Sequence, residues 1–336
     1  MTIVVTGAAG WFGSAFLDVL RHQDVEDVRV LVHSPADVPT TLAALPDARI
    51  HVGDVADPAV VSDLFAGVDS CEVVHAAAVI HPARVSDFER VNAVGAGVIV
   101  SEALRHGLRR FVHLSSNSAV GTNPTPEETF RDNEPYDPYL GYGLSKMRGE
   151  VVVRRALEEA TVPGVILRPP WFYGRFQPAR QARFLKTVRE GRFPLIGDGR
   201  NRRSMVDVDR LADCAWLALR SDTEAVRTYW VADARPYSMN EILDAVREAA
   251  IAEGLPVREA ALHLPAVAGK VAYRVDALLQ RFGRYQQEIH VAGELDKNIA
   301  CTVDGAIRDL GFEPARDLVD GMRVSYRWGL ENGQDV

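Results

Sequence analysis

The stretch that decides the fold opens the chain and reads Ile3-Val4-Val5-Thr6-Gly7-Ala8-Ala9-Gly10-Trp11-Phe12-Gly13. An apolar strand pattern runs into a glycine-rich turn and then into an apolar helical pattern from Ser14 to Leu20. This order suits a dinucleotide, because glycines permit a tight turn and a close backbone approach, and the first N–H groups of the helix are free to meet a pyrophosphate. The spacing is G-x-x-G-x-x-G rather than G-x-G-x-x-G, and a plain turn is the alternative.

Further strand patterns follow at Val28–Val32, Ala48–Val52, Cys71–His75 and Arg110–Leu114, with helical patterns such as Val91–Arg105 between them. Strands that alternate with helices predict an α/β fold with a Rossmann-type, doubly wound parallel sheet.

The alternation ends near Arg168, after which loops and scattered helices follow. We therefore predict an NAD(P)-binding Rossmann domain over residues 1–168. Residues 169–336 are expected to form mainly a smaller mixed substrate-binding region, with some segments returning to the Rossmann core.

Composition excludes several classes of protein. The 336 residues carry a net charge of −8, which argues against a nucleic-acid surface. No run approaches the roughly 18 apolar residues of a membrane span, and the N-terminus has no signal-peptide pattern, so we predict a cytoplasmic protein without an integral membrane segment. Cys71, Cys214 and Cys301 are odd in number and far apart, which suggests buried hydrophobic side chains and no metal site.

The predicted cofactor pocket extends along the strand ends. An acidic residue at the end of the second strand would bind the ribose of NAD, but His33 stands there, which leans weakly to NADP. Asp54, with Val55, could accept from the adenine amino group, although Asp54 could instead cap a helix that starts at Pro58. The small residues Ala76 and Ala77 would let a cofactor lie close to the backbone.

The chemistry is predicted to lie in Tyr142-Gly143-Leu144-Ser145-Lys146. Residues four apart on a helix share a face, and a neighbouring ammonium is expected to lower the pKa of a phenol from about 10. Tyr142 could then exchange a proton with a carbonyl oxygen. Ser116, at the end of the strand Arg110–Leu114, could hydrogen-bond the same oxygen. A solvated surface pair and a serine-rich turn are the alternatives.

Several short motifs together resemble the extended short-chain dehydrogenase/reductases of the NAD-dependent epimerase/dehydratase superfamily, in particular their 3β-hydroxysteroid dehydrogenase-like branch. The motifs are Thr6-Gly7-x-x-Gly10-x-x-Gly13, Asp54-Val55, His75-Ala76-Ala77-Ala78, Asn92, Ser115-Ser116, Tyr142-x-x-x-Lys146, Leu167-Arg168-Pro169-Pro170 and Gly311-Phe312-Glu313-Pro314.

This resemblance implies a Rossmann fold, NAD or NADP as cofactor, and Ser116, Tyr142 and Lys146 as the catalytic residues. Tyr142 and Lys146 would also contact the cofactor, as would Pro169. The resemblance places Gly7, Gly10, Trp11, Phe12 and Gly13 around the pyrophosphate and Asp54 and Val55 at the adenine.

Three further residues are predicted to contact substrate. Trp171 stands where the resembling sugar-nucleotide epimerases carry Asn, and its indole suits a bulky, less charged substrate. Asn117 follows the catalytic serine where the resembling dehydratases carry Asp-Glu, so dehydration is the least expected activity. Arg203 matches an arginine that binds a substrate phosphate in sugar-nucleotide enzymes, and its forked guanidinium suits an anion. A surface arginine is the alternative.

The segment from Leu264 to Phe282 alternates apolar and basic residues at helical spacing. It resembles a segment that roofs the substrate pocket in the 3β-hydroxysteroid dehydrogenase-like branch, and it could also rest on a membrane surface or pack as an ordinary helix. The helices Asn92–Arg105 and Tyr142–Ala160 are apolar on more than one face. In the resembling family this pair forms a homodimer interface, and burial within the monomer is the alternative.

The leading hypothesis is an NAD(P)-dependent oxidoreductase that interconverts a secondary alcohol and a ketone. The second is an NDP-sugar 4-epimerase that uses the same three residues through a transient ketone. A catalytically silent dinucleotide-binding scaffold is the third, and the intact Ser116, Tyr142 and Lys146 argue against it.

Overall fold

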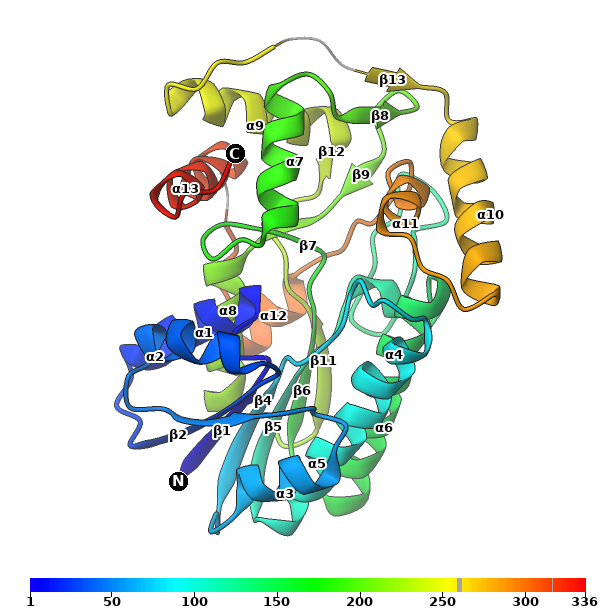
Figure 1. The fold of residues 1–336 in the computed structure, drawn as a ribbon. Helices are drawn as coiled ribbons and strands as arrows, with labels where there is room; N and C mark the ends of the chain where they lie inside the picture. Colours follow the sequence, from blue (N-terminus) through cyan, green and yellow to red (C-terminus); the bar gives the residue numbers. More distant parts are fainter. Residues whose placement is uncertain (259–261, 316) are drawn as a thin grey trace.

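The computed structural model describes residues 1–258, 262–315 and 317–336. At its centre lies a parallel sheet of seven strands in the order β11-β6-β5-β4-β1-β2-β3 (Figure 1). In chain order the strands are β1 Thr2–Thr6, β2 Asp27–Val32, β3 Arg49–Val52, β4 Cys71–His75, β5 Leu108–Leu114, β6 Gly164–Arg168 and β11 Val226–Trp230. The predicted doubly wound sheet is confirmed. Strand order reverses between β1 and β4, which opens a crevice at their carboxyl ends.

Helices cover both faces of this sheet. One face packs against α1 (Trp11–Arg21), α8 (Val208–Arg220) and α12 (Asp304–Leu310), and the other against α3 (Pro58–Phe65), α5 (Gly95–Arg105) and α6 (Leu140–Ala160). Every residue of β1, β4 and β6 is therefore buried. Burial on both sides explains why these strands read as continuous apolar runs.

The helix expected over Val91–Arg105 begins differently. A π-helical stretch, Glu89–Val94, follows the short α4 (Ser86–Phe88) and leads into α5. Gly149 of α6 approaches it so closely that a Cβ there would lie 2.6 Å from the Asn92 carbonyl oxygen. The wider turn accommodates this contact, and such turns frequently mark functional sites.

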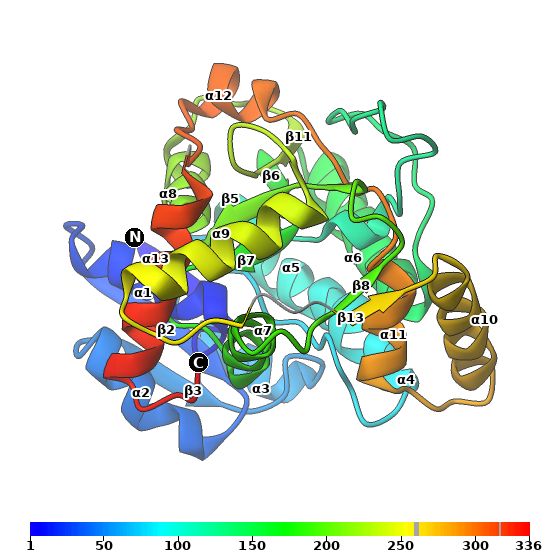
Figure 2. The ribbon, with the colours of Figure 1, turned by 90° about the horizontal axis from the view of Figure 1, so that it is seen from above.

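A second body lies beyond the carboxyl ends of the strands (Figure 1). Its apolar core joins α7 (Ala179–Arg189), α9 (Met239–Ala252) and α13 (Leu318–Glu331). Short strand pairs complete it: β7 Trp171–Tyr173 with β10 Met205–Asp207, β9 Arg202–Arg203 with β12 Tyr237–Ser238, and β8 Pro194–Ile196 with β13 Leu262–Leu264. Two more helices, α10 (Val267–Arg281) and α11 (Gln287–Glu294), stand at the outer edge (Figure 2).

The chain returns to the Rossmann core from this second body. After β10, α8 packs on α1, and β11 then extends the sheet beyond β6. None of the described helices is both long and apolar enough to cross a membrane.

Candidate active site

The glycine turn forms a cradle that side chains would fill. Gly7 has a φ of +70°, and a Cβ on it would lie 2.7 Å from the backbone of Ala76 and Ala77. A Cβ on Gly13 would lie 2.1 Å from the carbonyl oxygen of Gly7. Gly10 caps α1 without a side chain, so the N–H groups of the first helical turn stay open to a ligand. This cradle fits the pyrophosphate of a dinucleotide.

The side chains of Trp11 and Phe12 make contacts within the protein. Phe12 is buried and stacks on Phe16, so only its backbone N–H can face a pyrophosphate. The Trp11 indole donates a hydrogen bond to the Arg175 carbonyl oxygen at 2.6 Å, which joins the turn to the second body.

At the adenine end, Asp54 is already paired. Its carboxylate accepts from the Ala56 N–H at 2.9 Å and forms an ion pair with Arg90. Partial burial acts to raise the pKa of Asp54, but these two donors outweigh it and hold the pKa below its usual value. The alternative that Asp54 caps the helix from Pro58 is wrong, because Asp57 caps α3.

Val55 is buried against Gly95, and His33 is exposed at the end of β2. Arg90 was missed in the sequence because 36 residues separate it from Asp54 and no local pattern connects them.

Tyr142 lies in the first turn of α6 and faces Ser116. Burial raises its pKa to about 12, and the Ser116 hydroxyl acts in the opposite direction. Lys146 is almost fully buried one turn later, and its ammonium donates to the Leu114 carbonyl oxygen at 2.7 Å. Burial lowers the pKa of Lys146 to about 8. The expectation that the pKa of Tyr142 lies below its ordinary value is therefore wrong, because desolvation of the phenolate dominates.

The turn that carries Ser116 is held from two sides. Its hydroxyl accepts from the Ser118 N–H at 3.2 Å and donates to the Asn117 side-chain oxygen at 3.4 Å. The Asn117 N–H donates to the Pro169 carbonyl oxygen at 3.2 Å. Pro169 and Asn117 thus fix the serine at the end of β5.

Glu150, a further turn along α6, anchors the whole arrangement. Its carboxylate is fully buried and accepts from Arg168 at 2.7 Å, from the Tyr136 hydroxyl at 2.9 Å and from Ser115. These contacts tie α6 to the ends of β5 and β6. Glu150 was missed in the sequence, although its spacing of four from Lys146 places a charged residue on the buried face of the helix.

Asn92 connects the same helix to the loop after β4. Its amide nitrogen donates to Ser145 at 3.0 Å and to the Val79 carbonyl oxygen at 3.0 Å, while its oxygen accepts from the Val79 N–H at 2.8 Å. The loop that contains Ala76 and Ala77 is thereby held against the helix that carries Tyr142.

The cations of the second body face this site. Arg203 is buried, with its guanidinium 5.5 Å from the centre of the Trp171 ring and a hydrogen bond of 3.2 Å to the Glu294 carbonyl oxygen. The structure therefore brings together two of the predicted substrate residues.

Arg180, at the start of α7, was missed in the sequence. Its guanidinium lies 5.9 Å from the centre of the Trp11 ring. It is close enough to act on the pKa of Tyr142 and, after burial as the main cause, on that of His81, which is lowered to about 4.

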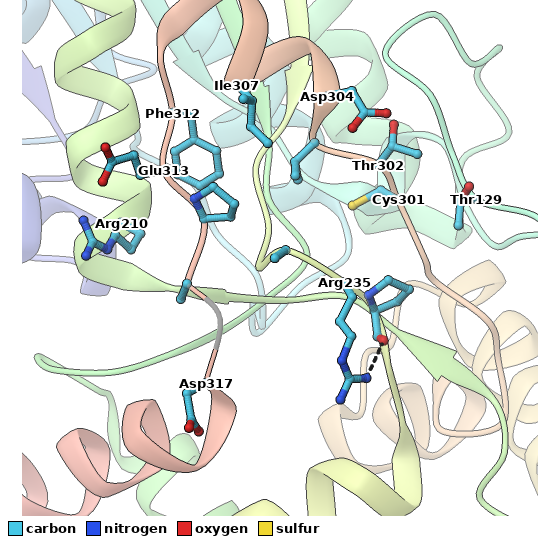
Figure 3. Close-up of a pocket in the computed structure, with 15 residues that line it drawn as sticks. Thr129, Arg210, Arg235, Cys301, Thr302, Asp304, Ile307, Phe312, Glu313 and Asp317 are labelled. Carbon is cyan, nitrogen blue, oxygen red and sulfur yellow. Dashed lines mark hydrogen bonds between the residues drawn. The ribbon is translucent and has the colours of Figure 1, made fainter.

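The structure also contains a hollow of about 870 Å³ (Figure 3). It is lined from α8, α12 and the loops around Arg235 and Glu313, and none of the predicted site residues is among the described residues that line it. Its cations and carboxylates are mixed, so no single sign of charge marks it for a ligand.

Known proteins share this architecture. Residues 3–232 match the family described as the NAD dependent epimerase/dehydratase family. An uncharacterised Sinorhizobium fredii protein, y4nL, is 39% identical over 99% of this chain and 96% of its own length.

Two characterised relatives also match. A Streptomyces griseus dTDP-glucose 4,6-dehydratase is 29% identical over 97% of this chain and 93% of its own. A Stenotrophomonas maltophilia 2-alkyl-3-oxoalkanoate reductase is 27% identical over 96% and 98%, respectively. The Bacillus cereus UDP-glucuronic acid 4-epimerase, solved with NAD, has the same fold, with a TM-score of 0.77 at 20% identity over 99% of both chains.

The buried contact of Glu150 predicts a large effect on stability. In Glu150→Gln, the Arg168 guanidinium would stay buried without a counter-charge, so we expect the free energy of unfolding to fall by about 3 kcal/mol or more. Urea unfolding measures this change. Glu159→Gln, which removes an exposed partner of Arg155, is the control and should change it by less than about 0.5 kcal/mol. Equal effects of both substitutions would contradict the anchoring role.

Proposed function

Because the chain belongs to the NAD dependent epimerase/dehydratase family, we propose that it is an NAD(P)-dependent oxidoreductase that interconverts a secondary alcohol and a ketone. One observation carries this proposal. Tyr142 and Ser116 face each other at the end of β5, with the buried Lys146 ammonium one helical turn further along α6. The glycine cradle at the end of β1 lies against the loop of Ala76 and Ala77 at the same edge of the sheet.

Each residue has a separate task in the proposed reaction. When bound, NADH or NADPH supplies the hydride. Ser116 orients the carbonyl oxygen by a hydrogen bond, and Tyr142 donates its proton to that oxygen. Because the raised pKa keeps Tyr142 protonated, it is ready to act as an acid in reduction. The charge of Lys146 stabilises the phenolate that remains.

We further propose that the ketone carries an anionic group. Arg180 places a cation close to Tyr142, and the 2-alkyl-3-oxoalkanoate for which the Stenotrophomonas maltophilia relative is named has a carboxylate two carbons from its ketone. A substrate of this class would present its ketone to Tyr142 and its carboxylate to Arg180, while the alkyl groups meet Trp171 and Phe184, whose ring centres lie 4.7 Å apart.

One feature weighs against dehydration, although a dehydratase is among the relatives. Asn117 and Ser118 follow Ser116, and neither is a carboxylic acid that could exchange protons to eliminate water. The apolar lining at Trp171 also supports membership in the 3β-hydroxysteroid dehydrogenase-like branch.

The remaining assignments stay predictions. His33 at the end of β2 favours NADP over NAD, since no carboxylate there repels a 2′-phosphate. A homodimer through α5 and α6 would cover Val94, Val151 and Val152, which are exposed. The cytoplasmic location is likewise a prediction.

An NDP-sugar 4-epimerase is the second candidate, favoured by Arg203, a buried cation that could meet a diphosphate. Incubation with UDP- and dTDP-hexoses separates the two activities. Epimerised sugar without net change in NAD(P)H would replace the oxidoreductase proposal, whereas oxidation of NAD(P)H by a 3-oxo acid with no epimerisation would support it.

We predict that Tyr142→Phe lowers kcat for ketone reduction by about 10²–10⁴-fold, because the proton donor is lost. Cofactor affinity, measured by calorimetry, should stay within about threefold, since the ring remains. Tyr273→Phe, at a half-exposed tyrosine of α10, is the control and should leave kcat unchanged. Full activity of the Tyr142 variant would remove this residue from its role.

The pH dependence of reduction should follow the titration of Lys146. Its ammonium is charged below a pKa of about 8 and neutral above it, whereas Tyr142 keeps its proton up to about 12. We therefore expect kcat/KM for reduction to be level below pH 8 and to fall about tenfold per pH unit above it. Stopped-flow or steady-state rates from pH 6 to 10 test this, and a level profile to pH 10 would contradict it.

Arg180→Gln should weaken recognition of the anionic group. We expect kcat/KM for a 3-oxo acid to fall about 10–100-fold, because a hydrogen bond between charged groups is lost, while its methyl ester changes less than about threefold. Arg192→Gln, an exposed cation paired with Glu190, serves as the control. Equal losses of kcat/KM for the acid and its ester would show that Arg180 does not recognise the carboxylate charge of the substrate.

A further inference from the structure

Helix α10 presents a continuous apolar face to solvent. The exposed fractions are 59% for Val267, 54% for Val271, 39% for Val275, 56% for Leu278 and 74% for Phe282. Steps of four, four, three and four residues place these side chains on one side of the helix. In both views α10 stands at the outer edge of the molecule, with α11 on its inner side (Figures 1 and 2).

The opposite side of α10 is fixed to the protein. Asp276 is fully buried and accepts from His290 at 2.7 Å and from Gln280 at 3.0 Å. The Gln280 side-chain oxygen accepts from the Gly141 N–H at 3.0 Å. A Cβ on Gly269 would lie 2.6 Å from the Asp296 carboxyl carbon. Since these contacts set the rotation of the helix, the apolar face cannot turn inward.

A row of cations borders the apolar face. Lys270, Arg274 and Arg281 are exposed and lie along one flank of the helix, and Arg284 follows just beyond its end. The only acidic residue between 262 and 284 is Asp276, on the buried side. This local charge is opposite to the net charge of −8 of the whole chain.

We propose that α10 binds peripherally to a membrane that contains anionic phospholipids. An apolar stripe beside a row of lysine and arginine side chains matches the two layers of such a surface, because the stripe can enter the acyl boundary while the cations meet the head groups. With 15 residues, α10 is about 22 Å long and would lie along the surface.

The charge row favours a lipid surface over a second copy of this chain. A symmetric contact between two α10 helices would bring two rows of like charge to one interface, where they repel. A bilayer supplies negative charge over the whole length of the helix.

The position of α10 determines where the candidate active site would lie relative to a bound membrane. Gln280 holds the N–H of Gly141, the neighbour of Tyr142. Beyond α10, the ring of Tyr285 lies 5.4 Å from that of Phe88, which in turn lies 5.8 Å from that of Tyr142. A docked α10 would therefore set the site close to the bilayer, where amphiphilic substrates gather. The docking itself does not depend on the proposed reaction.

Vesicle flotation with the full chain tests the proposal. We expect the protein to float with vesicles of phosphatidylcholine and phosphatidylglycerol, to stay unbound with phosphatidylcholine alone, and to be released by 0.5 M salt. Lys270→Gln, Arg274→Gln and Arg281→Gln combined should weaken partitioning by about 100-fold, at about fivefold for each charge. Val271→Ser, Leu278→Ser and Phe282→Ser combined should abolish it.

The control variants replace residues of the same chemical type on other helices. Arg105→Gln, Arg155→Gln and Arg308→Gln combined remove three exposed cations from other helices. Ile251→Ser, Ile307→Ser and Leu330→Ser combined remove exposed apolar side chains from α9, α12 and α13. Both controls should bind anionic vesicles like the parent, and all variants should reduce a water-soluble ketone at the parent rate.

Three results would overturn the proposal. These are failure of the parent chain to float with anionic vesicles, equal binding by the α10 variants and the parent, and a parent dimer that the α10 serine variant converts to a monomer in sedimentation velocity. The last result would assign the apolar face to a second copy of the chain.

Discussion

The site depends on one buried carboxylate. Glu150 is fully buried, and its oxygens accept hydrogen bonds from the Arg168 guanidinium at the end of β6, the Ser115 hydroxyl just after β5 and the Tyr136 phenol. A buried ion pair is costly unless its other hydrogen-bonding groups are satisfied, and here neutral donors satisfy the Glu150 oxygens. The rings of Tyr136 and Trp230 lie 5.2 and 5.9 Å from the Arg168 guanidinium, so the cation is also enclosed by π-faces. The register of α6 against the sheet follows from this cluster.

That register explains how the site can be both buried and charged. Lys146 lies between Glu150 and Tyr142 on the same face of α6, and burial lowers its pKa to about 8. The Glu150 carboxylate acts to raise this pKa, so the ammonium stays charged near neutral pH. Burial raises the pKa of Tyr142 to about 12, so its phenol stays protonated. A protonated phenol with a buried cation one helical turn away is the arrangement that the proposed proton transfer to a substrate oxygen uses.

The sequence predicted the parts of this site that depend on local order. The glycine turn, the strand ends and the Tyr142–Lys146 spacing each occupy a few consecutive residues, and the parallel sheet then brings them to one edge. What could not be predicted depends on distant contacts. Arg90 forms an ion pair with Asp54, and Arg180 lies close to Tyr142 from the second body, and no sequence periodicity connects either pair. The direction of the pKa shift of Tyr142 was also missed, because the depth of burial is a property of the assembled fold.

The same division between local and distant contacts separates the two halves of the protein. In the Rossmann half, the predicted residues lie at strand ends, in the glycine turn and on the first turns of α6, and packing on the sheet fixes their positions. In the second body, the side chains that face the site come from α7, β9 and the segment around α11, and their directions are set by contacts such as that of Arg203 with Trp171 and the Glu294 carbonyl oxygen. Substitutions there can change the charge and shape of the site without disturbing α6. The proposed chemistry therefore depends on the sheet, and we expect the choice of substrate to depend on the body above it.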